Sequence, residues 1–199
     1  MWHLLRVLPL LLTTTCFGPL GTFTSRRYAY SDGARLVQPA QLRPSLPDAS
    51  PDPEQCLAVL FANHRLDSGG HFIVGLREDH QGDALGAWDD EGFEILTLEL
   101  SRPVFGTRVP FNAVHDRLYY SAGGTAWAQL CAGVFGATGR GTVWLKRRWF
   151  GELAAEVDLL IDVRHARYPD SVEQRRVRRT VTLDRSAPNR LTRALTGAP

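Results

Sequence analysis

The sequence predicts a mainly β protein: a single antiparallel domain, sandwich or barrel-like, that follows a signal segment and a proline-rich spacer. Short apolar runs separated by Gly and Asp residues fill most of the chain, as in sheets of short strands. The 199 residues are 44% hydrophobic and 22% charged, which is typical of one soluble globular domain. We therefore expect a targeting segment over 1–24, a spacer over 25–55, the β-rich domain over 56–185 and a flexible tail over 186–199.

The first residues have the layout of a secretory signal. Arg6 and the free amine precede the leucine-rich run Val7–Leu12, which is followed by small and turn-forming residues. The run is well short of the roughly 20 residues that a spanning helix needs. We expect export to the periplasm, outer envelope or extracellular space; an apolar first strand or helix of the mature domain is the alternative.

Cys16 lies directly after this apolar run, where bacterial lipoproteins carry the cysteine that is lipidated. Their motif has Leu three positions before the cysteine and Gly, Ala or Ser immediately before it, whereas this chain has Thr13 and Thr15. The resemblance implies a lipid tether to the membrane. The alternative is an unmodified cysteine within a signal that is removed.

The spacer is defined by its composition. Residues 36–53 contain little periodic apolar sequence but five prolines, at positions 39, 44, 47, 51 and 53. Proline-rich segments of this kind are extended and semi-rigid. We interpret the segment as a tether between the targeting segment and the domain.

The run Leu153–His165 carries the strongest strand signal. Its alternate residues from Ala155 to Val163 are all apolar, while most residues between them are charged. A helix fits almost as many apolar positions and stays an alternative. The other expected strands are Cys56–His64, Gly70–Arg77, Gly92–Leu100, Arg117–Ser121, Thr125–Phe135, Gly141–Phe150 and Arg175–Arg185.

Charges indicate how the last two strands pair. Glu156, Asp158 and Asp162 share one face of the first strand, and Arg176 and Arg178 share one face of the second. Opposite charges on paired strands contribute roughly 0.2 to 1 kcal/mol each. We expect the two strands to be neighbours, with the acidic row beside the basic row.

The segments Gly141–Lys146 and Ala155–Val163 resemble the closing hairpins of uncharacterised β-rich bacterial cell-envelope proteins and lipoproteins. The shared pattern is Gly-Thr-Val followed by alternating apolar residues. The resemblance implies a β-rich fold and an envelope location. It implies no activity.

No group of residues in the sequence predicts catalysis, a metal or a cofactor. Asp67–Gly70 resembles the nucleophile motif of trypsin-like proteases, but four Asp, Ser and Gly residues between apolar runs are typical of a turn. His64 and His71 could face each other across that turn and bind a metal with Asp67 or His80; ordinary surface histidines are the alternative. The glycines at 133, 136, 139 and 141 are explained by turns and strand entry.

The run Trp144–Phe150 interleaves aromatic and basic residues. Such a run could bind single-stranded nucleic acid, anionic lipid or an anionic glycan, or consist of core tryptophans flanked by solubilising arginines. With a net charge of only +2, composition names no partner, and export argues against nucleic acid.

Cys56 and Cys131 are the two cysteines left in the mature domain. Exported domains commonly pair such cysteines, and a bridge here would contribute roughly 4 kcal/mol; two buried free thiols are the alternative. We expect a noncatalytic envelope domain with a binding or structural role. The alternative is a secreted hydrolase whose acids come from the loop Asp79–Asp90.

Overall fold

The computed structural model describes residues 23–37, 60–81, 92–124, 133–165 and 170–197. It confirms a mainly β domain. The strands are β1 (Phe23–Leu36), β2 (Leu66–Ser68), β3 (His71–Gln81), β4 (Gly92–Leu100), β5 (Arg108–Pro110), β6 (Arg117–Gly124), β7 (Val134–Arg147), β8 (Leu153–His165) and β9 (Val172–Arg185). Two helices follow β7 and β9: η1 (Trp149–Gly151) and α2 (Pro188–Thr196).

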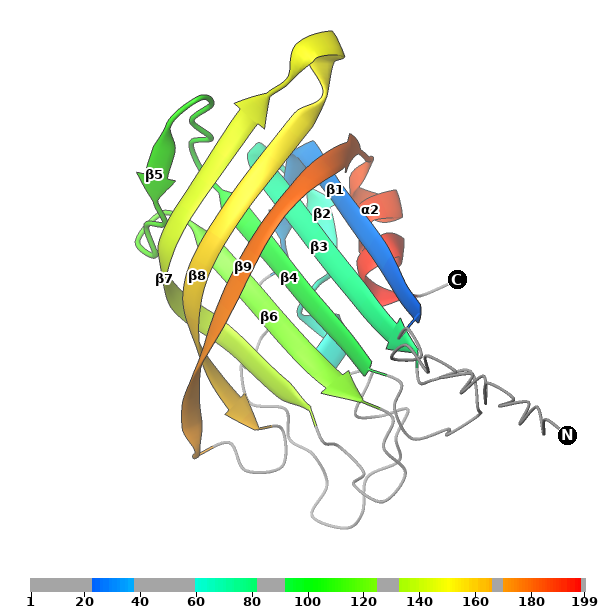
Figure 1. Cartoon of the computed structure of the whole chain (residues 1–199), viewed down its shortest axis with the longest axis vertical. Helices are drawn as coiled ribbons and strands as arrows, with labels where there is room; N and C mark the ends of the chain where they lie inside the picture. Colours follow the sequence, from blue (N-terminus) through cyan, green and yellow to red (C-terminus); the bar gives the residue numbers. More distant parts are fainter. Residues whose placement is uncertain (1–22, 38–59, 82–91, 125–132, 166–169, 198–199) are drawn as a thin grey trace, which may run out of the picture.

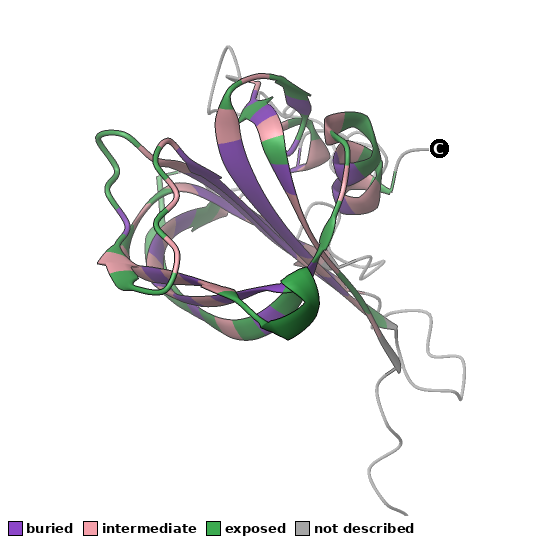
Figure 2. Ribbon diagram, turned by 90° about the horizontal axis from the view of Figure 1, so that it is seen from above, coloured by how far each residue is buried: buried purple, intermediate pink, exposed green. Residues whose placement is uncertain are grey.

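The nine strands of the described residues belong to one sheet that closes on itself. The strand order is β2-β1-β3-β4-β6-β7-β8-β9, and β5 pairs with β7. Ala29 and Tyr30 of β1 also pair in parallel with Asp184 and Arg185 of β9. Seen from above, the sheet curls into a ring, with α2 outside it (Figure 2). The barrel-like form of the expected fold is therefore correct.

The alternation in β8 has the predicted cause. Its apolar series from Leu153 to Val163 is buried in the sheet interior, where it packs against residues of β3, β4, β6, β7 and β9. The residues between them, such as Asp158 and Asp162, face outward. Strand is thus the correct interpretation of this run, and the helical alternative is wrong.

Opposite charges meet on the outer face of β8 and β9, as predicted. Arg176 donates two hydrogen bonds to Asp158, of 2.9 and 2.8 Å, and Arg178 is the register partner of Asp158. The hydrogen bonds from Arg176 lower the pKa of the Asp158 carboxyl. Glu156 instead contacts Arg108 of β5 and Lys146 of β7.

Two glycines in β7 let it pack closely on β8. A Cβ atom at Gly141 would lie 2.0 Å from the Asp158 carbonyl oxygen, and one at Gly136 would lie 2.6 Å from that of Asp162. Gly141 also has a φ of +151°, and the register shifts between Phe135 and Thr138. Glycines and bulges of this kind allow a sheet to bend and close.

A second, smaller core lies on the outer face of the sheet. The residues at 186–199 were expected to be a flexible tail, but 188–196 form α2, whose Leu191 and Leu195 are buried. Pro188 begins the helix, and Gly197 ends it with a left-handed backbone whose N–H donates to the Arg193 carbonyl. Among the described residues, no helix is long and apolar enough to cross a membrane.

Two further expectations need correction. Residues 25–36 were assigned to the spacer, yet they lie in β1. The described part of the expected strand Cys56–His64 is not a strand. Residues 60–62 are helical, and His64 lies in the turn that follows. The prolines of the spacer and residues 125–132 lie outside the described residues, and β7 begins at Val134.

Candidate functional site

The interior of the closed sheet is apolar in its middle and polar towards one end. Side chains two residues apart on a strand face the same side. Beyond Leu76 of β3 the next inward residue is Glu78, and before Leu96 of β4 it is Glu94. Arg179 of β9 lies between the core residues Val177 and Val181 and faces the same interior. We call Tyr28, Glu78, Glu94, Tyr120 and Arg179 the interior polar cluster.

Arg179 joins two carboxylates that would otherwise repel each other. Glu78 and Glu94 are register partners on β3 and β4, and like charges in that position are destabilising. The Arg179 Nη2 atom lies 2.9 Å from Glu78 Oε2 and 2.5 Å from Glu94 Oε2. Because β9 is not a neighbour of β3 or β4, this contact crosses the sheet interior.

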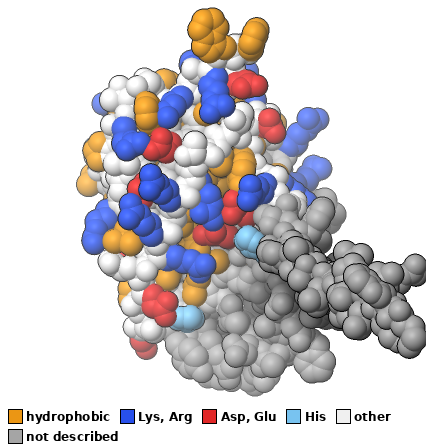
Figure 3. All heavy atoms as spheres, viewed as in Figure 1, with side chains coloured by type: hydrophobic (Ala, Val, Ile, Leu, Met, Phe, Trp, Pro, Cys, Tyr) orange, Lys and Arg blue, Asp and Glu red, His pale blue; other side chains and the backbone are white. Residues whose placement is uncertain are grey.

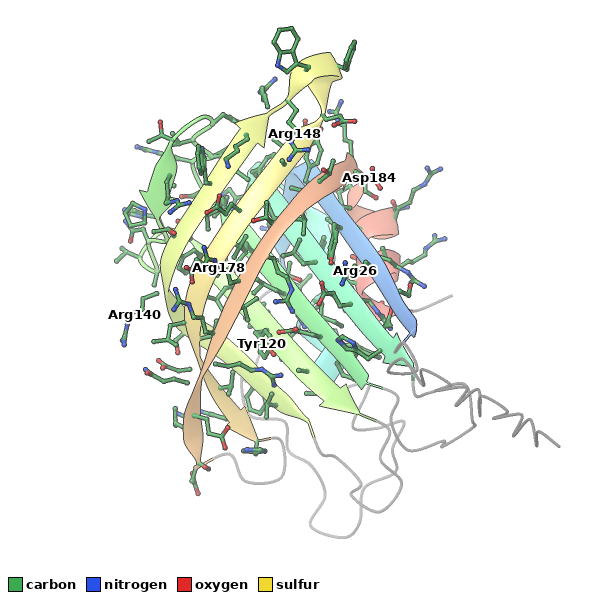
Figure 4. All side chains as sticks on the ribbon, viewed as in Figure 1. Arg26, Tyr120, Arg140, Arg148, Arg178 and Asp184 are labelled. Carbon is green, nitrogen blue, oxygen red and sulfur yellow. The ribbon has the colours of Figure 1, made fainter. Side chains whose placement is uncertain are left out.

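Each carboxylate also receives a hydrogen bond from a tyrosine. The Tyr28 hydroxyl donates to Glu78 Oε1, and the Tyr120 hydroxyl donates to Glu94 Oε1 at 2.9 Å. Arg26 adds a weaker contact, with its Nε atom 3.8 Å from Glu78 Oε1. The buried Glu78 and the partly buried Glu94 therefore each have one tyrosine and Arg179 as donors. Figure 4 shows Arg26 and Tyr120 on the strands behind β9.

The electrostatics fix the protonation states of the cluster. Burial, followed by the hydrogen bond to Glu78 and the charge of Glu78, raises the pKa of Tyr28 to about 12. Burial and the charge of Glu94 raise the pKa of Tyr120. Burial alone would raise the pKa of Glu78, but the hydrogen bonds from Tyr28 and Arg179 and the nearby arginine charges outweigh it and lower that pKa. At neutral pH Glu78 is an acceptor and both tyrosines are donors.

A cavity of about 310 Å³ opens beside this cluster. Its walls include Glu94 together with His80, Ala122, Val134 and Arg175. The Arg175 guanidinium lies 5.7 Å from the centroid of the Tyr120 ring, and no carboxylate among the described residues forms an ion pair with it. On the face shown in Figure 3, acidic, basic and histidine side chains gather near the border of the grey atoms. The cavity thus combines an arginine that forms no ion pair with a described carboxylate, an imidazole and apolar surface.

A second polar group lies on the outer face of the sheet and is completely buried. Ser121 donates to the Leu60 carbonyl at 3.0 Å, so its oxygen accepts from His64 Nε2 at 2.9 Å. His64 Nδ1 must then accept from the Thr97 hydroxyl, 2.8 Å away. Burial, and secondarily the charge of Arg77, lowers the pKa of His64 to about 3. This neutral histidine joins the segment at 60–64 to the sheet.

The third polar group is built around Glu99, which is buried on the outer face of β4. The carboxylate accepts from the Leu36 N–H at 2.7 Å and from His71 Nδ1, and Arg117 Nη2 lies 3.5 Å away. A cavity of about 220 Å³ beside it is lined by Arg35, Leu36, Val37, Asp67 and Arg117. The carboxylate holds the end of β1 to β4 and leaves Arg117 half-exposed at the cavity.

The structure separates the histidines that could have formed a metal site. His64 bonds to Thr97 and Ser121, His71 bonds to Glu99, and His80 lies at the cavity by the interior polar cluster. The described part of the chain holds no group of three or more His, Cys, Asp or Glu residues that could bind a metal.

The protease-like motif and the cysteines have separate outcomes. Asp67 and Ser68 lie in β2, and only Gly69 and Gly70 link β2 to β3. The expected hairpin turn is wrong, because both strands pair with β1 and not with each other. Cys16, Cys56 and Cys131 lie outside the described residues. Of the acidic loop at 79–90, the described Asp79 accepts a hydrogen bond of 2.7 Å from Arg77.

Sequence analysis did not identify the interior polar cluster. A readable signal was present, since Glu78 and Glu94 continue the inward series of two otherwise apolar strands, where an acid is unusual. The partner arginine could not be chosen in this way, because β9 also carries arginines at 175, 176, 178 and 185.

The two carboxylates of the polar end already accept hydrogen bonds from the protein itself. Glu78 and Glu94 each accept from one tyrosine and one arginine. The pKa of Glu78 is lowered, because its hydrogen bonds and the nearby arginine charges outweigh burial, whereas a general acid needs a raised pKa. Arg175 and His80 line the cavity and form no ion pair with any residue that the structure describes. No protein-family model, curated protein or solved structure matches this chain.

Proposed function

We propose that this protein is a noncatalytic exported domain that binds a small molecule with an anionic group at the polar end of its closed sheet. The observation that carries the proposal is the cavity of about 310 Å³ with Arg175 in its wall. Its volume lies at the lower end of the range for small-molecule sites. A single guanidinium in a partly apolar cavity is a suitable partner for a carboxylate, sulfonate or phosphate.

The neighbouring cluster supports this division of roles. The charge of Arg179 is used within the protein, because both Glu78 and Glu94 contact it. Arg175, four residues earlier on the same strand, contacts the ring of Tyr120 and has no acidic partner among the described residues. Glu94 of the cluster therefore lies in the cavity wall, while no described carboxylate takes up the charge of Arg175, which can meet a ligand there.

A probe with an anionic group and an apolar body tests the site. We expect anilinonaphthalene sulfonate to bind the folded protein at one site with a rise in fluorescence, and Arg175→Gln to weaken that binding by roughly tenfold, as expected for a lost charge-assisted hydrogen bond. Arg178→Gln is the matched control, because Arg178 lies on the outer face of the same strand. Equal affinities of wild type and Arg175→Gln would contradict the proposal.

The export part of the proposal rests on the N-terminal sequence. The positive start, the short leucine-rich run and Cys16 support transfer out of the cytoplasm, with or without a lipid. Fractionation of producing cells tests the location, and cytoplasmic full-length protein would count against it. Labelled fatty acid should attach to wild type and not to Cys16→Ala if the chain is a lipoprotein.

An exported domain also fits a bridge between Cys56 and Cys131. Both cysteines would remain after removal or lipidation of the N-terminal segment, in a compartment that favours oxidation. Peptide mapping of unreduced protein from the periplasm tests the bridge. Complete alkylation of both thiols without reduction would exclude it.

A further inference from the structure

The hairpin that joins β7 and β8 ends in two fully exposed aromatic side chains. Trp149 and Phe150 form η1 with Gly151, and their exposed fractions are 89% and 102%. A hydrogen bond of 2.8 Å from the Arg148 N–H to the Glu152 carbonyl closes the turn. The hairpin projects beyond the rest of the sheet in Figure 1, and its hydrophobic side chains stand uncovered in Figure 3.

The backbone at this tip is strained at an aromatic residue. Phe150 has φ 68° and ψ 17°, in the left-handed region that glycine adopts without cost. Among the described residues, Phe150 is the only non-glycine residue with a positive φ. Gly151 follows with φ 80°. No packing contact compensates the strain, since the Phe150 side chain is fully exposed. Strain of this kind points to a role for the side chain outside the fold.

Basic side chains surround the base of the aromatic tip. Arg147 and Arg148 directly precede Trp149, and both are exposed. The Arg147 guanidinium lies 4.7 Å from the centroid of the Phe105 ring, and neither arginine forms an ion pair with a described residue. Figure 4 labels Arg148 just below the tip. Along the hairpin axis, aromatic rings therefore lie outermost and positive charges lie behind them.

We propose that the tip formed by residues 147–151 inserts into the surface of an anionic lipid membrane. Trp149 and Phe150 would lie among the headgroups and upper acyl chains, where aromatic rings are favoured. Arg147 and Arg148 would then reach the level of the lipid phosphates, at which each basic residue adds to binding. The order of these groups along one axis matches a planar surface that is negative outside and apolar inside.

The proposal is independent of the ligand cavity. Val134, which lines the cavity, begins β7, and Arg147 ends it. At roughly 3.3 Å per residue, the strand separates the two by about 40 Å. Membrane contact through the tip would leave the cavity open.

Vesicle flotation with the full chain tests the proposal. We expect binding to vesicles of phosphatidylcholine and phosphatidylglycerol in equal parts, and weaker binding to phosphatidylcholine alone. Phe150→Gly should lower the affinity for the mixed vesicles by roughly tenfold through the lost apolar burial, and Arg148→Gln by roughly fivefold. Val114→Ser is the matched control, because Val114 is 84% exposed on a different loop.

Phe150→Gly also separates membrane contact from a role in folding. Glycine relieves the positive φ, so the variant should melt at the same temperature as wild type or higher while it binds vesicles less well. A variant that loses binding together with stability would instead show a structural role for Phe150 and overturn the proposal.

A local readout distinguishes the tip from the apolar N-terminal run, which every variant carries. Brominated lipids quench tryptophan emission on contact, and we expect the quenched component to disappear in Trp149→Phe. Equal quenching in Trp149→Phe, or equal flotation of Phe150→Gly and wild type, would overturn the proposal. Tip-dependent binding to a single-stranded oligonucleotide without binding to vesicles would overturn it in favour of nucleic acid.

Discussion

Glu78 and Glu94 lie directly opposite each other on neighbouring strands, and a single arginine from across the sheet interior contacts both. Arg179 belongs to β9, which is separated from β4 by β6, β7 and β8 on one side and from β3 by β1 on the other. The ion cluster therefore joins β9 to two strands that are not its neighbours in the closed sheet. It keeps the polar end in a fixed shape beside the cavity.

Removal of Arg179 should leave the buried Glu78 carboxylate and the partly buried Glu94 carboxylate without their shared cation. We expect Arg179→Met to lower the free energy of unfolding by about 3 kcal/mol near pH 7, because an unpaired buried charge is costly. Part of the loss should be recovered near pH 5, where a carboxyl of the repelling pair can take up a proton. Urea denaturation at both values measures this. Arg178→Met is the control, and an equal effect of both substitutions would contradict the account.

The two tyrosines of the cluster should make the fold sensitive to alkali. The pKa of Tyr28 is raised to about 12 and that of Tyr120 is also raised, so the folded state keeps phenolic protons that the unfolded state loses from about pH 10. Their contribution to stability is complete below about pH 10 and is lost as pH rises through the folded pKa. Tyr28→Phe combined with Tyr120→Phe should flatten this fall in denaturation curves. An unchanged fall would assign it to other groups.

His64 should act at the opposite end of the pH range. Its pKa falls from an ordinary value near 6.5 to about 3 in the folded protein, so unfolding takes up a proton at acid pH. Its stabilising contribution is complete above about pH 6.5 and declines by up to about 1.4 kcal/mol per pH unit below it.

Substitution of His64 measures that contribution. His64→Gln keeps a polar side chain and removes the titration, so its stability should depend less steeply on pH between about 6 and 4. The control is His165→Gln, since His165 is half-exposed and contacts Glu173 on the outer face. A variant with the same acid slope as wild type would show that His64 does not carry it.

Gly141 should be among the least replaceable residues of the sheet. In Gly141→Ala the new Cβ would lie 2.0 Å from the Asp158 carbonyl oxygen at a φ that alanine disfavours, and we expect a loss of about 3 kcal/mol. Gly106 also has a positive φ, 83°, but no atom lies within 4 Å of its Cβ position. Gly106→Ala should therefore cost only about 1 kcal/mol. Thermal melting of both variants checks the difference, and equal losses would contradict it.

Local pattern predicted the strands whose two faces differ. In β8 the inward residues are all apolar and many outward ones are charged, so the two-residue period of a strand can be read from the sequence alone. β1 was missed because its inward residues include Arg26 and Tyr28, which belong to the polar end and interrupt any apolar period. In α2 the signals were present, with Pro188 at the start and Gly197 at the end, but its apolar face consists mainly of Leu191 and Leu195.

The interior polar cluster depends on information that no single segment carries. The meeting of Glu78 with Glu94 requires the register of β3 and β4, and the choice of Arg179 requires the sheet to close. The sequence predicted only part of the exposed tip. The run Trp144–Phe150 showed the aromatic and basic residues, but not the turn that separates Trp144 from Trp149. In the structure Trp144 contacts Lys146 and Arg108, whereas Trp149 contacts solvent.

The pairing of β1 with β9 closes the sheet, and it therefore limits when during synthesis the described domain can finish folding. It joins the first described strand to the last through two register pairs, with a further hydrogen bond from Ser186 N–H to the Tyr30 carbonyl. The ring therefore stays open until residue 186 has left the ribosome or the translocation channel, however early the strands between have paired. Until that moment the apolar interior is accessible from one side. For a chain that crosses a membrane unfolded, the emergence of β9 would be the event that completes the enclosure.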